Sequence, residues 1–245
     1  MRIPRLYLPT PLAPGLTVPL DERAFNHAVR VLRLGVDAPV TLFNGQGGAF
    51  AATLIEVGKR QALAQVLDVL PGEVESPLSV TLAQGVSRGE KMDYTLQKAV
   101  ELGVTTIQPL FTERGGVDLT GERLMRKVQH WRGVMIGACE QCGRNRLPEL
   151  REPLLLLDGL QRLAEAPGLK LLLDPLATTG LRSLPPPLGP VTLLIGCEGG
   201  FSPAELATAR GAGFIGMCLG PRILRTETAG VAALAAMQTL WGDCS

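Results

Sequence analysis

The chain has 245 residues, of which 46% are hydrophobic and 19% charged, and its formal net charge is +1. This length supports one large domain or two modest ones, and the composition excludes a disordered chain and a disulfide-stapled mini-protein. No apolar run is as long as a membrane span, and the amino-terminal MRIPRLYLPTPLAPG lacks the apolar core of a signal peptide. We therefore expect a cytoplasmic protein without membrane contacts. The five cysteines favour reduced thiols, and two histidines offer no basis for a metal site.

The first part of the chain is typical of a small β-rich domain. In residues 40–57, VTLFNGQGGAFAATLIEV, the pairs Asn44-Gly45 and Gly47-Gly48 separate two strand-like runs. The stretch at 70–77, LPGEVESP, is polar and flanked by prolines, as joints between domains often are. The sequence thus predicts a β-domain over 1–70 and a second domain over 76–245.

From Leu78 onward, predicted strands alternate with predicted helices. Apolar runs predict strands at 78–86, 105–110, 170–174, 191–196 and 215–220. This alternation favours an α/β domain with a largely parallel sheet. Two helix starts are marked by a serine with a glutamate three residues later, at Ser87-Glu90 and at Ser202-Glu205. The first helix is predicted to end at Gly103, and the second carries a proline at its first position.

An arginine-rich segment lies in the middle of the chain. Residues 123–151 carry seven basic side chains against Glu140 and Glu149, a local excess of +5. Guanidinium groups bind phosphate and stack on bases, so this segment is a candidate RNA-binding surface. A solvated helix face in an arginine-rich composition is the alternative. The segment is predicted to be helical because apolar residues fall on one stripe: Leu124, Val128, Trp131, Met135, Ala138 and Cys142.

Two short motifs carry no function in our interpretation. Cys139 and Cys142 match C-x-x-C, but Cys142 lies on the apolar stripe and no strand leads into the motif, so we expect core cysteines. The run from Gly211 to Gly216 matches G-x-G-x-x-G, yet it follows a helix and precedes a strand, the reverse of a dinucleotide-binding motif. We interpret it as a helix-ending turn.

Two loops near the carboxyl terminus are the strongest candidates for a ligand site. The first, 195–202, follows a predicted strand and contains three glycines that permit close approach of backbone to a ligand. The second, 219–229, leaves the last predicted strand and contains a dense Arg-Thr-Glu-Thr cluster. Ligands of open α/β sheets bind beyond the carboxyl ends of strands, so these loops are expected to frame one pocket. The alternative is that the glycines only make tight turns.

At these loops the sequence resembles a known family. GCEGGFSPAEL followed by LGPRILRTETAGVAAL closely resembles the carboxyl-terminal signature of the RsmE family, SPOUT-class methyltransferases that modify a uridine of small-subunit ribosomal RNA. Further similar stretches are EKMDYTLQKAVELGV at 90–104, ACEQCGR at 138–144 and HAVRVLRL at 27–34. The resemblance spans essentially the whole chain.

The resemblance implies a fold, a cofactor and an assembly. It implies an amino-terminal PUA-like β-barrel, a carboxyl-terminal SPOUT α/β domain with a trefoil knot, bound S-adenosyl-L-methionine and a homodimer. The implied cofactor-binding residues are Gly196, Glu198, Gly199, Gly200, Leu219, Gly220, Ile223, Leu224, Thr226 and Thr228. The chain departs from the family at Cys197, where proline is usual, and at 87–90, where a lysine and an aspartate are commoner.

The implied reaction is methylation of N3 of a uridine in 16S ribosomal RNA. Arg225, or its neighbour Arg222, is expected to stabilise negative charge on the uracil, and Glu198 or Glu227 to accept the proton. An ordinary first-turn carboxylate is an equally good interpretation of Glu227. The expected RNA contacts are Arg123, Arg126, Arg144 and Arg146. Two other functions stay open at this point: a non-catalytic RNA-binding ribosome-assembly protein, and a small-molecule enzyme.

Overall fold

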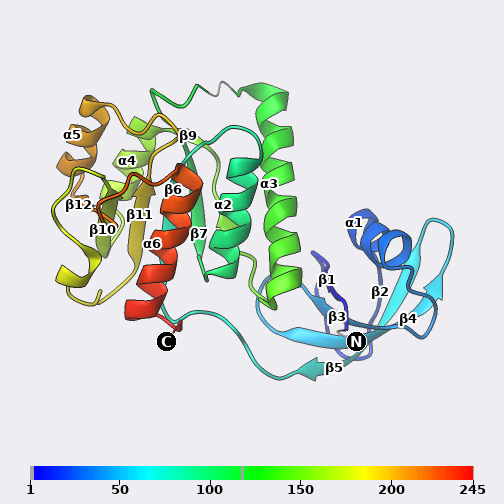
Figure 1. Ribbon diagram of the computed structural model, residues 1–245. Helices are drawn as coiled ribbons and strands as arrows, with labels where there is room; N and C mark the ends of the chain where they lie inside the picture. The colour runs from blue at the N-terminus through cyan, green and yellow to red at the C-terminus, as the bar shows by residue number, and fades with distance from the viewer. Residues whose placement is uncertain (1–2, 117–118, 245) are drawn as a thin grey trace. The chain divides into compact units, whose positions relative to one another are not determined.

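The computed structural model describes residues 3–116 and 119–244, which form two compact units (Figure 1). The first unit comprises Met1–Glu75 and Ile136–Leu147, and the second comprises Ser76–Met135 and Pro148–Ser245. The predicted domain bounds, 1–70 and 76–245, stay a prediction, and residues 136–147 group with the first unit by their contacts. Two ion pairs hold this segment in the first unit, Glu140 with Arg23 and Arg144 with Glu75.

The first unit is built on a five-stranded sheet with the strand order β1-β3-β4-β5-β2. The pair β1 and β3 is parallel, and the other pairs are antiparallel. The predicted turn between β3 and β4 is confirmed, and Gly45, Gly47 and Gly48 all have positive φ there. The elements are β1 (Arg5–Tyr7), β2 (Thr17–Pro19), α1 (Glu22–Phe25), the π-helix η1 (Asn26–Val31), β3 (Pro39–Phe43), β4 (Ala49–Val57) and β5 (Ala62–Leu70).

The second unit contains a seven-stranded parallel sheet with the order β12-β10-β11-β6-β7-β8, and β9 also pairs with β7. All five strands predicted in this part are present, which confirms the α/β class. The trefoil knot stays a prediction. The strands are β6 (Val80–Gly85), β7 (Thr106–Phe111), β8 (Glu149–Leu150), β9 (Leu154–Leu155), β10 (Leu169–Leu173), β11 (Val191–Ile195) and β12 (Ile215–Met217).

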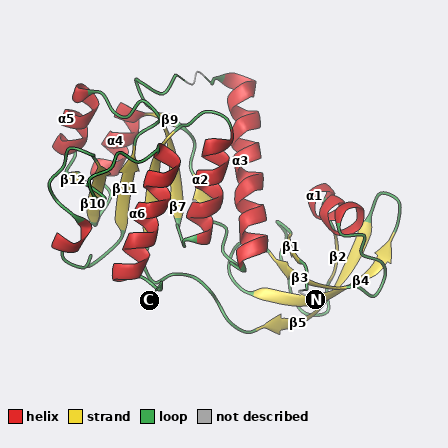
Figure 2. Ribbon diagram, viewed as in Figure 1, coloured by secondary structure: helices red, strands yellow, loops and turns green. Residues whose placement is uncertain are grey.

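Helices cover both faces of this sheet (Figure 2). Successive residues of a strand point to opposite faces, and Ala83 and Leu194 share a core cluster with residues of α4 and α5. Their neighbours Gln84 and Ile195 face the other way, toward Gly230 of α6. The helices of this unit are α2 (Glu90–Glu101), α4 (Leu156–Ala164), the short 3-10 helix η2 (Leu181–Ser183), α5 (Pro203–Gly211) and α6 (Thr226–Trp241).

The long helix α3 (Gly121–Cys142) confirms the helix predicted for the arginine-rich segment. The middle of the predicted stripe is buried, with Trp131, Met135 and Ala138 at most 1% exposed. The helix begins in the second unit and ends in the first, because the unit boundary falls between Met135 and Ile136.

One predicted helix start is confirmed and the other is wrong. At α5, Ser202 accepts from the amide of Glu205, and the Glu205 carboxylate accepts from the amide of Ser202, a complete capping box. At α2 the residue before the helix is Gly89, with φ +60°, and the Ser87 hydroxyl donates to the Gly85 carbonyl instead. The left-handed stop at Gly103 is confirmed, with φ +77°.

The C-x-x-C motif at 139–142 and the G-x-G-x-x-G motif at 211–216, which we interpret as without function, have structural roles. Burial raises the pKa of the Cys139 thiol to about 12, so this residue is a protonated core thiol. The segment 211–216 turns from α5 into β12, with Gly213 at φ +88°. Over the described residues, no helix combines the length and apolarity needed to cross a bilayer.

Candidate functional site

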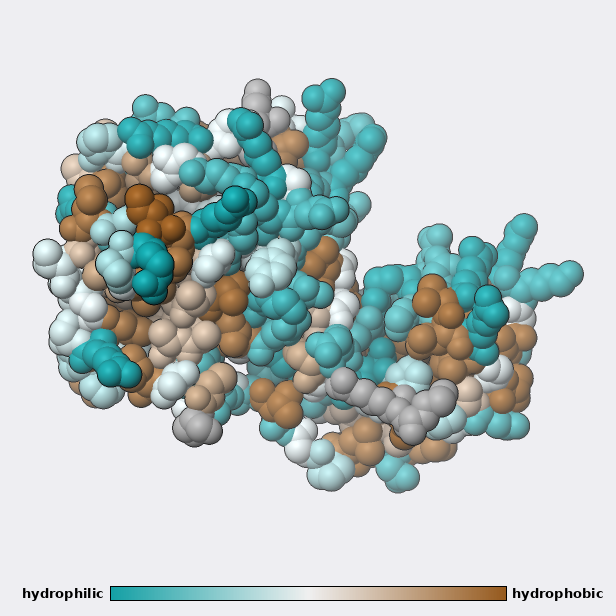
Figure 3. Space-filling view, in the orientation of Figure 1, coloured by the Kyte–Doolittle hydropathy of each residue, from teal (hydrophilic) through white to brown (hydrophobic). Residues whose placement is uncertain are grey.

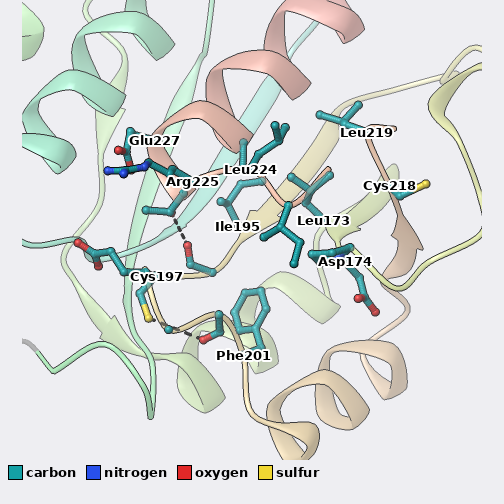
Figure 4. A pocket seen from close by; sticks show the side chains of 18 of the residues that line it. Leu173, Asp174, Ile195, Cys197, Phe201, Cys218, Leu219, Leu224, Arg225 and Glu227 are labelled. Atoms are coloured by element: carbon teal, nitrogen blue, oxygen red, sulfur yellow. Dashed lines mark hydrogen bonds between the residues drawn. The ribbon is translucent and has the colours of Figure 1, made fainter. Parts of the chain in front are cut away.

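A cavity of about 660 Å³ opens in the second unit beyond the carboxyl ends of β10 and β11 (Figure 4). This volume is typical of a site for a small organic ligand. Both predicted loops line it, the first from 196 to 201 and the second from 219 to 227. The apolar side chains of Leu173, Ile195 and Leu224 point into the same space.

Glycines are required where the first loop leaves β11. A side chain on Gly85, at the end of the neighbouring strand β6, would collide with the backbone amide of Cys197. A Cβ on Gly196 would lie only 3.2 Å from Cα of Gly200. The turn is closed by the amide of Gly200 donating to the Cys197 carbonyl over 3.0 Å. The loop is therefore folded tightly onto itself and onto β6.

Hydrogen bonds tie this loop to the start of α6. The Thr226 hydroxyl donates to the Gly196 carbonyl over 2.5 Å. The fully buried Gln84 donates from Nε2 to Thr226 Oγ1 over 2.9 Å. Thr226 thus joins the two loops that frame the cavity, and its hydroxyl is committed to the protein.

Glu198 links the cavity loop to the beginning of α2. Its Oε1 accepts from the Arg88 amide over 3.0 Å and lies 3.3 Å from Nζ of Lys91. Partial burial raises the pKa of Glu198, but the Arg88 hydrogen bond and Lys91 together outweigh burial, so the pKa lies below its usual value. A carboxylate of this kind is a weak proton acceptor.

Glu227 and Arg225 lie at the start of α6 and also line the cavity (Figure 4). Within the described part of the chain, Oε2 of Glu227 is buried and has no hydrogen-bond donor. A buried carboxylate oxygen without a donor is costly unless a ligand or water supplies one. Arg225 is exposed. The cavity therefore offers one open acceptor and one solvent-facing cation, two residues apart in the sequence.

Comparison with known proteins identifies the family. The sequence matches the RNA methyltransferase domain family over residues 74–238 and the RNA methyltransferase PUA domain family over residues 20–67. Ribosomal RNA small subunit methyltransferase E of Buchnera aphidicola subsp. Schizaphis graminum is 38% identical, and the alignment covers 100% of this chain and 99% of that protein. The chain belongs to the ribosomal RNA small subunit methyltransferase E family.

Two solved structures are similar to this RsmE-family chain over 99–100% of its length. The enzyme of the same name from Neisseria gonorrhoeae, bound to S-adenosyl methionine, is 41% identical, with a TM-score of 0.92 and 100% coverage of both chains. A Legionella pneumophila structure with bound SAM is 43% identical, with a TM-score of 0.95, and covers 99% of this chain and 100% of its own. The predicted RsmE resemblance is confirmed.

The structure brings most of the predicted RsmE site residues together. Of the ten residues expected to bind cofactor, Thr228 is exposed and does not line the cavity. All three expected catalytic residues, Arg225, Glu198 and Glu227, line it. The other nine expected cofactor residues also do so: Gly196, Glu198, Gly199, Gly200, Leu219, Gly220, Ile223, Leu224 and Thr226.

Cys197 stands where the RsmE family usually has proline, and hydrogen bonds to Gly200 hold the loop at this position. The Cys197 side chain is 4% exposed, and its Sγ donates to the Gly200 carbonyl over 3.7 Å. This weak bond adds to the backbone bond between the same two residues. Two hydrogen bonds between Cys197 and Gly200 therefore close the loop where the family usually has a proline.

The predicted RNA-binding arginines separate into two groups. Arg123, Arg126 and Arg146 are exposed. The Arg144 side chain is 4% exposed and its guanidinium binds the Glu75 carboxylate through Nε and Nη2. This burial and pairing argue against an RNA contact by Arg144, which stays an untested prediction.

Sequence reasoning missed two parts of the cavity wall. Asp174 and Leu173 come from the end of β10, where Asp174 pairs with Arg210 over 2.8 Å. Arg114 comes from the loop after β7. Both lie at the carboxyl ends of parallel strands, so the rule that located the two glycine loops would have located these segments as well.

Proposed function

We propose that this chain transfers a methyl group from S-adenosylmethionine to N3 of a uridine in the 16S RNA of the small ribosomal subunit. Its family and full-length relatives make it an S-adenosylmethionine-dependent methyltransferase of small-subunit ribosomal RNA. The observation that carries the finer proposal is the meeting of two loops, 196–201 and 219–227, around one cavity with an open carboxylate and an arginine.

The cavity fits S-adenosylmethionine in size and in the chemistry of its walls. Its volume of about 660 Å³ is ample for a nucleoside with an amino-acid arm. Leu173, Ile195 and Leu224 provide apolar surface for an adenine ring, and the glycine backbone at 196–200 leaves room for close approach. When bound, the cofactor supplies a methyl group on a sulfonium, whose thioether is a good leaving group.

The chain's own residues have to prepare the nucleophile. N3 of uridine carries a proton at neutral pH and lies on the Watson–Crick edge, so the base has to be unpaired or extruded and its proton removed. We assign proton acceptance to Glu227, whose Oε2 is buried without a donor among the described residues. We assign to Arg225 the stabilisation of the negative charge that develops on the uracil. Glu198, bound to Arg88 and Lys91, is assigned to holding the cavity loop against α2.

Binding of the RNA is assigned to the first unit and to exposed arginines. The first unit contains the segment that matches the RNA methyltransferase PUA domain family, 20–67. Arg123, Arg126 and Arg146 are exposed and available to phosphates. The exposed pair of Arg126 with Glu122 does not prevent this, because such pairs contribute little. The homodimer implied by the resemblance is part of this proposal.

Transfer of radiolabelled methyl groups tests the proposal. Wild-type protein is incubated with labelled cofactor and small ribosomal subunits, protein-free ribosomal RNA, or no RNA, and the RNA is digested to nucleosides for mass spectrometry. We expect label in 3-methyluridine and none without RNA. Label in another nucleoside would refute N3 as the target. RNA binding without any transfer would favour a non-catalytic assembly protein, and transfer to a small molecule would indicate a different enzyme.

A pair of variants tests the residue roles. Glu227→Gln should lower kcat by about 10²-fold or more, as loss of a general base does, with unchanged cofactor affinity. Glu198→Gln should affect cofactor affinity and stability more than kcat, because its proposed role is to hold the loop. The reverse pattern would exchange the two assignments.

A further inference from the structure

A short loop after β7 forms a wall of the cavity that the catalytic assignments above do not use. It spans residues 112–116, Thr-Glu-Arg-Gly-Gly, and turns tightly, with the amide of Gly115 donating to the Thr112 carbonyl over 3.0 Å. Arg114 stands at this turn, lines the cavity and is exposed. Its guanidinium is therefore presented to solvent at the edge of the cavity.

Contacts from three other segments hold this loop in place. The Glu113 amide donates to Oε1 of Glu205 over 2.8 Å, and Glu205 is only 7% exposed. Gly199 packs so closely that a Cβ there would lie 2.7 Å from Cβ of Arg114. Nη2 of Arg88 donates to the Gly116 carbonyl over 3.3 Å. The backbone that carries Arg114 is fixed before a ligand arrives, which lowers the entropic cost of a contact.

The described carboxylates that line the cavity form no ion pair with Arg114. Two of the cavity carboxylates already have cations, since Asp174 pairs with Arg210 and Glu198 pairs with Lys91. No carboxylate in the described part of the chain lies within ion-pair distance of Arg114. Figure 3 shows hydrophilic side chains gathered over α2 and α3 beside the amino-terminal end of α6. Arg114 therefore adds an exposed cation to the edge of the cavity.

We propose that Arg114 binds a backbone phosphate of the RNA segment that carries the target nucleotide. This inference rests on the proposed function, because it names how the substrate is held at the same cavity. A guanidinium fork matches phosphate oxygens in a bidentate manner. When a base enters the cavity, the phosphates of its nucleotide come to the cavity edge. Arg114 lies at this edge on a fixed loop. Arg114 contacts substrate at this edge and takes no part in proton transfer.

Salt-dependent binding tests the proposal. Affinity of the full-length protein for small ribosomal subunits that lack this methyl group is measured over a range of salt concentrations. For Arg114→Ala we expect several-fold weaker binding and a salt slope lower by about one unit, the signature of one lost phosphate contact. Arg114→Lys keeps the charge but loses the fork, so its slope should match wild type and its affinity should lie between the two.

Controls separate this proposal from its alternatives. Arg162→Ala, an exposed arginine on α4 outside the cavity wall, should leave the affinity and slope unchanged. Calorimetric titration of Arg114→Ala with S-adenosylmethionine should give wild-type affinity. Lost cofactor affinity in the folded variant, or an unchanged salt slope, would overturn the phosphate contact. Methyl transfer by wild-type protein is measured in parallel, so failure of the proposed function is seen separately as absence of transfer.

Discussion

One methyl group added at Gly199 should change the cavity wall directly. An alanine Cβ there would lie 2.7 Å from Cβ of Arg114 and 2.8 Å from the Arg114 carbonyl oxygen, whereas ordinary contact begins at 3.4 Å. The two loops therefore have to part by about 0.6–0.7 Å. Overpacking of this kind costs about 1–3 kcal/mol. If that cost falls on the bound state, Gly199→Ala weakens cofactor binding about 5- to 150-fold.

Calorimetric titration with S-adenosylmethionine, together with a thermal melt, measures this effect. The matched control is Gly211→Ala at the end of α5, where a Cβ meets nothing within 4 Å. The control should keep wild-type cofactor affinity, and its helical position makes it slightly more stable. A folded Gly199→Ala protein with unchanged affinity would show that the contact with Arg114 does not shape the cavity.

Three further predictions concern charges and thiols. Glu75→Gln removes the charged partner of the buried Arg144 and should cost about 2–4 kcal/mol in urea unfolding, and a loss below about 1 kcal/mol would contradict the pairing. Native Cys139, whose pKa is raised to about 12, should resist iodoacetamide at pH 8 while the exposed Cys244 reacts, as mass spectrometry would show. Because the Glu198 pKa lies below its ordinary 4.5, ionised Glu198 stabilises the fold at neutral pH. The difference in melting temperature between wild type and Glu198→Gln should therefore shrink as the pH falls below about 4.5, and a constant difference would argue against this.

The sequence predicts the cavity well where local signals and topology coincide. The strand before Gly196 and the capping box at Ser202 are both local features, and the carboxyl-end rule then places a site between them. Arg114 carries no comparable local signal. Its importance depends on Gly199 and Glu205, which lie 85 and 91 residues further along the chain. Contacts of that range are set by packing and cannot be predicted from spacing.

Two departures from the sequence patterns have a similar physical origin. The Ser87-Glu90 pattern satisfies the capping rule, but Gly89, with a positive φ, is the residue before α2, and the helix starts at Glu90. Arg144 contributes to a local charge excess, but charge counted along the sequence ignores partners, and its partner Glu75 is 69 residues away. Local patterns describe which interactions a segment favours. Local patterns do not show which distant residue the fold brings to a segment as its partner.

The interleaving of the two units along the chain has a consequence for synthesis on the ribosome. The first unit needs residues 136–147, which are made only after 76–135 of the second unit. Domains usually fold in order as they leave the ribosome. Here the amino-terminal sheet emerges early but has to wait for Glu140 and Arg144 before Arg23 and Glu75 find their partners. The nascent chain therefore carries an incomplete first unit while residues 76–147 are translated. The partners of Arg23 and Glu75 are made near the end of that stretch.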